Sequence, residues 1–141
     1  MATTRTAKTH WEGSLTEGAG QVTLESSGIG TYDVSWAARA EEPNGKTSPE
    51  ELIAAAHSSC FSMALSNMLN KAGSPPQALD TKADVTFQPG EGITGIHLTV
   101  VGSVEGMSAE DFAKHAEDAK VNCPVSQALT GTTITLDASL A

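Results

Sequence analysis

The feature that most constrains the fold is one long helical run from Ser48 to Gly73, SPEELIAAAHSSCFSMALSNMLNKAG. Ser48 can cap the N-terminus, Pro49 suits the first helical position, and Glu51 stands where a capping box places its carboxylate. Gly73, which is followed closely by two prolines, predicts the C-terminal end. The helix would hold about 24 residues and measure roughly 36 Å. We therefore expect it to be central to the fold.

Apolar side chains recur along this run at helical spacing, which predicts a buried face. Three consecutive alanines at 54–56 would let another backbone approach closely. The residues predicted to line the buried face are Ile53, Ala56, Cys60, Met63, Ala64 and Met68, widened by Leu52 and Leu65.

The flanking segments alternate in the manner of strands. Segments 10–15, 20–26 and 31–41 are separated by glycine turns and predict an antiparallel meander. Beyond the long helix, residues 78–106 predict a hairpin that turns at 89–92, and Ser108 begins a further helix. Pro124 opens a short helix, and residues 132–140 read as a last strand. We predict a single α+β domain over residues 1–141, with helices covering one face of a sheet.

Charge and composition exclude several classes of function. The chain has 8 Lys and Arg against 17 Asp and Glu, a net charge of −9, which argues against binding nucleic acid or anionic membranes. No apolar stretch approaches the roughly 20 residues of a membrane span, and the N-terminus lacks the apolar core of a secretory signal. We expect a cytoplasmic protein whose two cysteines are free thiols, a transient catalytic pair or core residues.

The two cysteines occupy different local settings. Cys60 lies midway along the apolar helix, where burial raises the pKa of a thiol and the helix dipole contributes little. Simple packing is the plainer interpretation of such a residue. Cys123 directly precedes Pro124 and is placed to cap the next helix, where free N–H groups favour a thiolate. Local context therefore favours Cys123 as the nucleophile, or as a capping residue only.

Few cations could activate either thiol. The two arginines are Arg5, near the N-terminus, and Arg39, at the end of the third predicted strand. Arg39 could fork onto the Glu50 carboxylate at the start of the long helix and turn the rest of its guanidinium toward a thiolate. A solvated surface pair is the alternative interpretation.

Histidine chemistry gives weaker signals. His57 precedes Cys60 by one helical turn and could act as a base, although a lone histidine beside an apolar face is more often structural. The cysteines and a histidine could in principle hold zinc, but no CxxC or HxxxH spacing supports such a site. Redox chemistry at the thiol pair remains the sharpest hypothesis.

Several motifs together resemble the OsmC/Ohr family, the osmotically inducible protein C and organic hydroperoxide resistance proteins. They are HWEG at Trp11, TSPEELIAAAHSSCFSMAL around Cys60, ADVTF, and NCPVSQAL at Cys123. The resemblance covers nearly the whole chain and favours the OsmC branch. It implies an α+β homodimer with intertwined subunits, a strongly curved antiparallel sheet and the long helix at the interface.

The same resemblance implies thiol-dependent reduction of peroxides, with organic hydroperoxides often preferred. Cys60 matches the peroxidatic cysteine, Cys123 the resolving cysteine, Glu50 the carboxylate ahead of the first cysteine and Arg39 its partner. It implies a Cys60 sulfenic acid and then a Cys60–Cys123 disulfide, reduced by an external dithiol or lipoyl-type reductant without cofactor or metal. By this resemblance Cys60 is the nucleophile, whereas the local context of the two cysteines favours Cys123. A non-catalytic stress-response binding module and a peroxide sensor are the alternatives.

Overall fold

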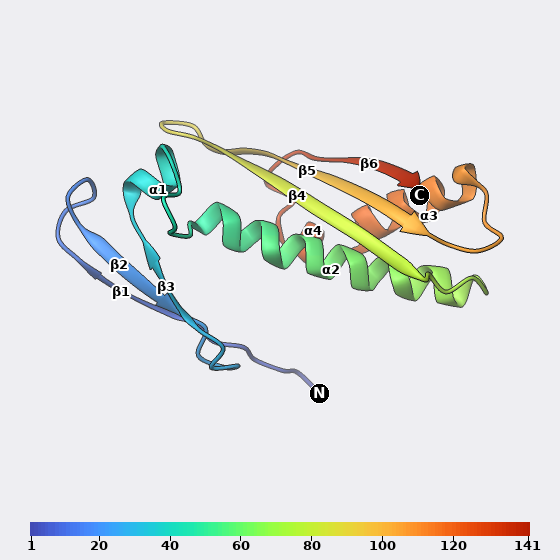
Figure 1. Cartoon of the computed structure of the whole chain (residues 1–141), viewed down its shortest axis with the longest axis horizontal. Coiled ribbons are helices and arrows are strands. Elements are labelled where there is room, and N and C mark those ends of the chain that lie inside the picture. The colour runs from blue at the N-terminus through green and yellow to red at the C-terminus, as the bar shows by residue number, and fades with distance from the viewer. The chain divides into compact units, whose positions relative to one another are not determined.

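The computed structural model describes residues 1–141 (Figure 1), and the chain divides into two compact units, Met1–Leu52 and Ile53–Ala141. Helix α2 (Pro49–Lys71) begins in the first unit and continues through the second. Each unit has its own three-stranded sheet. The predicted α+β class and the long helix are confirmed. The single domain over residues 1–141 stays a prediction.

The N-terminal unit is built on the predicted antiparallel meander. Strands β1 (Lys8–Glu12), β2 (Ala19–Thr23) and β3 (Thr31–Val34) pair in that order. Val22, on the middle strand, is the buried apolar residue of this sheet. The sheet therefore presents one apolar side near its centre.

Strand β3 is shorter than predicted, because the chain enters helix α1 (Trp36–Ala40) directly after it. The Ser35 side chain accepts a hydrogen bond from the Ala38 N–H at 3.1 Å and caps this helix. Alanines follow, and alanine has the highest helix propensity. The prediction that Arg39 ends a strand is therefore wrong, since Arg39 lies in the last turn of α1.

The C-terminal unit combines α2 with the second sheet and two further helices. Strands β4 (Ala78–Gln88) and β5 (Gly92–Ser103) form the predicted antiparallel hairpin. Its remaining elements are α3 (Ala109–Asn122), α4 (Pro124–Ala128) and β6 (Ile134–Leu140). Strand β6 pairs parallel to β5, so this sheet is mixed and not wholly antiparallel. A parallel neighbour needs a long crossover, which α3 and α4 supply here.

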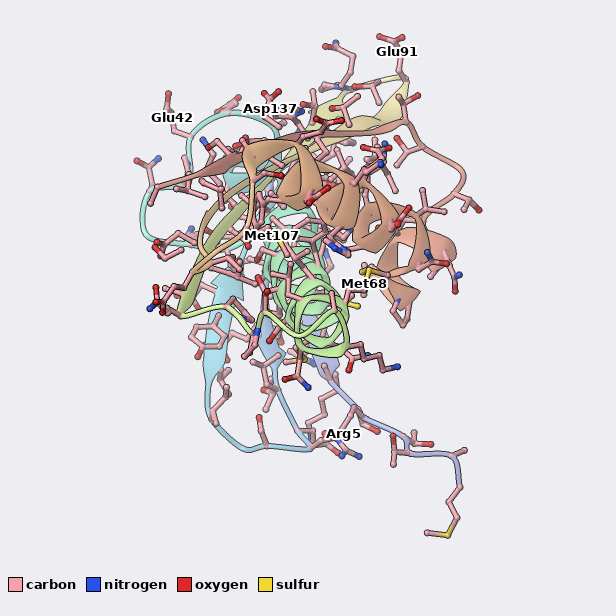
Figure 2. All side chains as sticks on the ribbon, turned by 90° about the vertical axis from the view of Figure 1, so that its right-hand side faces the viewer. Arg5, Glu42, Met68, Glu91, Met107 and Asp137 are labelled. Atoms are coloured by element: carbon pink, nitrogen blue, oxygen red, sulfur yellow. The ribbon has the colours of Figure 1, made fainter.

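The core of the C-terminal unit lies between α2, α3 and the sheet. Figure 2 shows α2 almost end-on, with the sheet and α3 of the same unit above it. The α2 residues buried there are spaced by four, so they share one side of the helix. Fully buried members of this core are Phe61, Leu65, Leu69, Leu98, Val100, Phe112, Ala116, Ala119 and Cys123.

The buried side of α2 differs from the predicted one. Phe61 and Leu69 are buried, whereas Ala56 is exposed and Met63 is 72% exposed. Apolar residues occur on several sides of this helix, so its sequence alone leaves open which side packs inward. As a consequence, the exposed side of α2 carries apolar residues such as Ala56 and Met63 among polar ones such as Ser59.

Both ends of α2 follow their sequence signals. The Ser48 hydroxyl accepts a hydrogen bond from the Glu51 N–H at 3.2 Å, as an N-cap does. The Glu51 carboxylate accepts from the Thr47 hydroxyl at 2.7 Å instead of completing a capping box. At the other end Gly73 has φ of +86°, a conformation that glycine adopts without strain.

Length and composition alone would allow α2 to cross a membrane, contrary to our expectation that no stretch is long enough. It is 23 residues long and sufficiently apolar along its length. Core helices of soluble proteins meet the same criterion, and Phe61, Leu65 and Leu69 pack into the core of the C-terminal unit. We therefore interpret α2 as a core helix.

Candidate active site

The two cysteines, distant in sequence, meet in the C-terminal unit. Cys60 lies midway along α2, and Cys123 lies at the junction between α3 and α4. Their sulfur atoms are 2.9 Å apart, and both residues are free thiols. Cys123 is fully buried, whereas Cys60 is only partly buried. The pair can therefore bond to each other, and an incoming reagent meets Cys60 first.

Proline creates the junction that places Cys123. The Cys123 N–H donates to the Ala119 carbonyl at 2.8 Å, which completes the last turn of α3. Pro124 cannot donate a backbone hydrogen bond and starts α4 instead. The backbone of Cys123 is accordingly extended, with φ of −56° and ψ of 126°, and its side chain makes no capping hydrogen bond to α4.

The environment of Cys60 favours the neutral thiol. Burial raises the pKa of Cys60, and its hydrogen bond and charge interaction with Cys123 raise that pKa further. A hydrogen bond to the backbone of Val125 acts in the opposite direction on the pKa. Val125 belongs to the first turn of α4, so the helix start that was predicted to serve Cys123 serves Cys60 instead.

Arg39 and Glu50 form an ion pair within the N-terminal unit. The Arg39 Nε atom donates to Glu50 Oε1 at 3.0 Å and to Oε2 at 3.1 Å, and Nη2 donates to Oε2 at 2.9 Å. The Glu50 side chain is 8% exposed and that of Arg39 is 32% exposed. A forked arginine–carboxylate pair of this kind is geometrically specific. The predicted pairing of these two residues is thus observed, with Arg39 on α1 in place of a strand.

An apolar cavity of about 380 Å³ adjoins this ion pair inside the N-terminal unit. Arg39 and Pro49 stand at its wall beside two indole rings, those of Trp11 and Trp36. Apolar walls with one cationic group suit a small ligand that has an alkyl or aryl part and a polar end. The remaining lining residues are Thr9, Leu15, Val22, Val34, Ser35 and Leu52.

His57 makes a contact that sequence reasoning missed. Its ring is fully buried, and Nε2 lies 2.7 Å from the Ser126 hydroxyl, which is also buried. The other ring nitrogen, Nδ1, has no hydrogen-bond partner. Burial lowers the pKa of His57, which favours the neutral imidazole. The sequence did hold a signal for this contact: two residues separate His57 from Cys60, and two residues separate Cys123 from Ser126.

No group of three or more His, Cys, Asp or Glu residues is arranged to hold a metal ion. The two cysteines therefore have no third side chain of these types placed beside them as a zinc ligand. The chemistry open to this site is that of two thiols at bonding reach.

Comparison with known proteins agrees with this architecture. The family model described as OsmC-like protein matches residues 42–137. Peroxiredoxin OsmC of Escherichia coli (strain K12) is 43% identical over 143 residues, covering 99% of both chains. The chain therefore belongs to the OsmC-like protein family.

Solved structures share the fold. An organic hydroperoxide resistance protein OsmC from Legionella pneumophila is 22% identical with a TM-score of 0.72, covering 99% of this chain and 98% of its own. The organic hydroperoxide resistance protein OhrB of Bacillus subtilis is 23% identical with a TM-score of 0.65, covering 96% and 98%. These likenesses extend over nearly the whole chain, so both units belong to the family fold.

Proposed function

We propose that this protein is a cysteine-based peroxidase that reduces organic hydroperoxides to alcohols with electrons from an external thiol. The observation that carries the proposal is the contact of two free thiols at 2.9 Å, one partly accessible and one buried. Membership of a family that includes Peroxiredoxin OsmC supports it. Hydrogen peroxide is a second substrate of the same chemistry.

The proposed cycle has three steps. The Cys60 thiolate attacks the distal peroxide oxygen, the O–O bond breaks, and the alkoxide leaves as the alcohol after taking a proton. Cys60 is then a sulfenic acid, which the Cys123 sulfur attacks, so that a disulfide forms and water leaves. A dithiol or lipoyl-type reductant restores both thiols by exchange. No bound cofactor takes part in this scheme.

Arg39 and Glu50 take supporting roles in the proposal. Because burial raises the pKa of Cys60, a positive group is needed to make its thiolate available at neutral pH. We assign that role to the Arg39 guanidinium, which the carboxylate of Glu50 orients through its forked hydrogen bonds. Arg39 also polarises the peroxide. The apolar cavity beside this pair suits the alkyl part of the substrate.

We also propose that the protein is a cytoplasmic homodimer. Apolar residues such as Met63 remain exposed on α2 within the single chain. A second copy would cover that side and complete the substrate pocket. Light scattering on the purified protein tests this assembly, and Met63→Glu should shift the mass toward one chain.

Steady-state turnover distinguishes the peroxidase from its alternatives. The purified protein is mixed with tert-butyl or cumene hydroperoxide and excess dithiol, and remaining hydroperoxide is followed with time. Many equivalents consumed per chain support the enzyme. One equivalent consumed without turnover indicates a peroxide sensor, and no oxidation indicates a non-catalytic binding module. A peptide map after one equivalent should contain the Cys60–Cys123 crosslink.

A further inference from the structure

Two side-chain contacts join α2 to the start of α4, and they run in opposite order along the two segments. Cys60 meets Cys123 at 2.9 Å, and His57 meets Ser126 at 2.7 Å. Residues three apart on a helix lie on the same side, so the two contacts are one turn apart on α2. The hydrogen bond between His57 and Ser126 is therefore a second contact between these two segments, beside the thiol pair.

The hydrogen bond is well placed to hold α4. This helix has five residues, and Ser126 is its one buried residue. Both partners are buried, with His57 at 0% and Ser126 at 3% exposure, and a hydrogen bond inside a protein is stronger than one in water. Removing one partner would leave the other unpaired in an apolar setting, which opposes the docked position of α4.

The backbone of Cys123 is anchored to both neighbouring helices: its N–H donates to Ala119 of α3 at 2.8 Å, and its carbonyl accepts from the Gln127 N–H of α4 at 3.0 Å. The residue is extended, and its side chain makes no capping hydrogen bond. The position of its sulfur therefore depends on how the end of α3 and the start of α4 both pack against α2. Proximity of two reacting groups is a large source of rate in a unimolecular step.

We infer that His57 and Ser126 are positioning residues for disulfide formation, because their hydrogen bond keeps the Cys123 sulfur within reach of oxidised Cys60. The inference rests on the proposed peroxidase function. In the step concerned, the Cys123 sulfur bonds to the Cys60 sulfur and the S–O bond of the sulfenic acid breaks. The hydroxide that leaves takes the Cys123 proton and departs as water.

Only one ring nitrogen of His57 takes part, since Nδ1 has no partner. That asymmetry defines matched variants. His57→Gln can present an amide near the position of Nε2, whereas His57→Leu cannot make the bond. Ser126→Thr keeps the hydroxyl and Ser126→Ala removes it. Ser62→Ala is the control, because its hydroxyl joins α2 to Thr81 of β4 at 2.8 Å and not to α4.

The test is a single turnover with one equivalent of tert-butyl hydroperoxide. Dimedone trapping and mass spectrometry follow sulfenic acid formation and disulfide formation separately. Ser126→Ala and His57→Leu should slow disulfide formation by about tenfold or more, while the first oxidation stays within about twofold of the parent. His57→Gln, Ser126→Thr and Ser62→Ala should form the disulfide near the parent rate. Unchanged disulfide formation in folded Ser126→Ala and His57→Leu would overturn the inference.

A second measurement needs no peroxide. Each variant is equilibrated with reduced and oxidised glutathione, and the fraction of Cys60–Cys123 disulfide gives an equilibrium constant. Ser126→Ala should shift this constant about tenfold toward the dithiol, and Ser62→Ala should leave it unchanged. If the parent protein fails to consume hydroperoxide, the proposed function fails, and this equilibrium still decides the positioning role. An unchanged equilibrium constant in Ser126→Ala would overturn the positioning role.

Discussion

The thiol pair of the C-terminal unit and the ion pair of the N-terminal unit contrast in nearly every physical respect. Cys123 lies in an apolar core and the partly buried Cys60 packs against it, where burial raises the pKa of Cys60. Arg39 and Glu50 are charged partners joined by three hydrogen-bond contacts at the start of α2.

The difference separates two requirements of thiol chemistry. Burial and packing bring two sulfurs together with precision, but the same burial disfavours the thiolate that must react. A forked ion pair supplies oriented positive charge, but it carries no nucleophile. In the proposed mechanism each region provides what the other cannot, and substitutions in either one should have distinct kinetic signatures.

The largest expected effect comes from removing the sulfur that reacts first. Cys60→Ser should lower hydroperoxide consumption by about a thousandfold or more, because a serine hydroxyl is a poor nucleophile toward peroxide. Cys123→Ser should still allow the first oxidation but stop at the sulfenic acid, which then overoxidises. Mass spectrometry of the intact chain distinguishes the two. Equal losses of the first oxidation in both variants would contradict the assigned order.

The next largest effect comes from removing the positive charge of Arg39 in the N-terminal unit. Arg39→Ala should raise the pKa of Cys60 and slow the first oxidation by about tenfold to a hundredfold, because in the proposed mechanism the guanidinium is the cation that stabilises the thiolate. Arg39→Lys should recover only part of the rate, since an ammonium cannot hold the carboxylate with a planar fork. The pH dependence of Cys60 alkylation in a Cys123→Ser background measures the shift. A rate and profile untouched by Arg39→Ala would remove the ion pair from the activation scheme.

The buried imidazole predicts a pH dependence of stability that belongs to the thiol region. Burial holds the pKa of His57 below 6.5 in the folded protein, so below pH 6.5 the unfolded chain takes up a proton that the folded one excludes. Folding stability should be complete above pH 6.5 and should fall as the pH decreases, by at most about 1.4 kcal/mol per pH unit.

Urea unfolding at pH 7.5 and pH 5.5 checks this dependence, with His57→Gln as the matched control. The glutamine variant keeps the other three histidines and loses only the buried one. Its stability should therefore change less between the two pH values. An equal pH response in both proteins would mean that His57 contributes no linkage.

Much of this arrangement was accessible from the sequence. Local signals carried the limits of α2, because Ser48, Pro49 and Gly73 act within a few residues of the helix ends. The hairpin and the cap of α3 at Ser108 were predicted for the same reason. Family membership, now confirmed, rested on the motifs around Cys60 and Cys123.

The remaining errors arose where tertiary contacts decide between locally equivalent choices. The alternation through Trp36 favoured a strand, whereas the Ser35 cap and the alanines that follow produce α1. Apolar residues around α2 left its buried side open, and packing placed Phe61 inward. No local signal states that β6 runs parallel to β5 or that His57 meets Ser126, since both depend on how the chain returns after α3.

The smallest predicted effect again separates the two regions, this time through the cap of α2. Ser48→Ala removes the hydroxyl that accepts from the Glu51 N–H and should cost about 1 kcal/mol of stability. Glu51→Ala should cost less, because its carboxylate accepts from Thr47 and not from the helix backbone. Thermal unfolding of the two variants gives the comparison.

The same cap supports the first turn of α2, which carries Glu50, while Cys60 lies several turns further along. Fraying at Ser48 should therefore loosen the Arg39–Glu50 fork and slow the first oxidation by about twofold to threefold. Disulfide formation, which depends on α2 and α4 at Cys60 and Ser126, should keep its rate. Slowing of both steps in Ser48→Ala would show that the two regions respond as one, and the separation of charge supply from thiol placement would then be wrong.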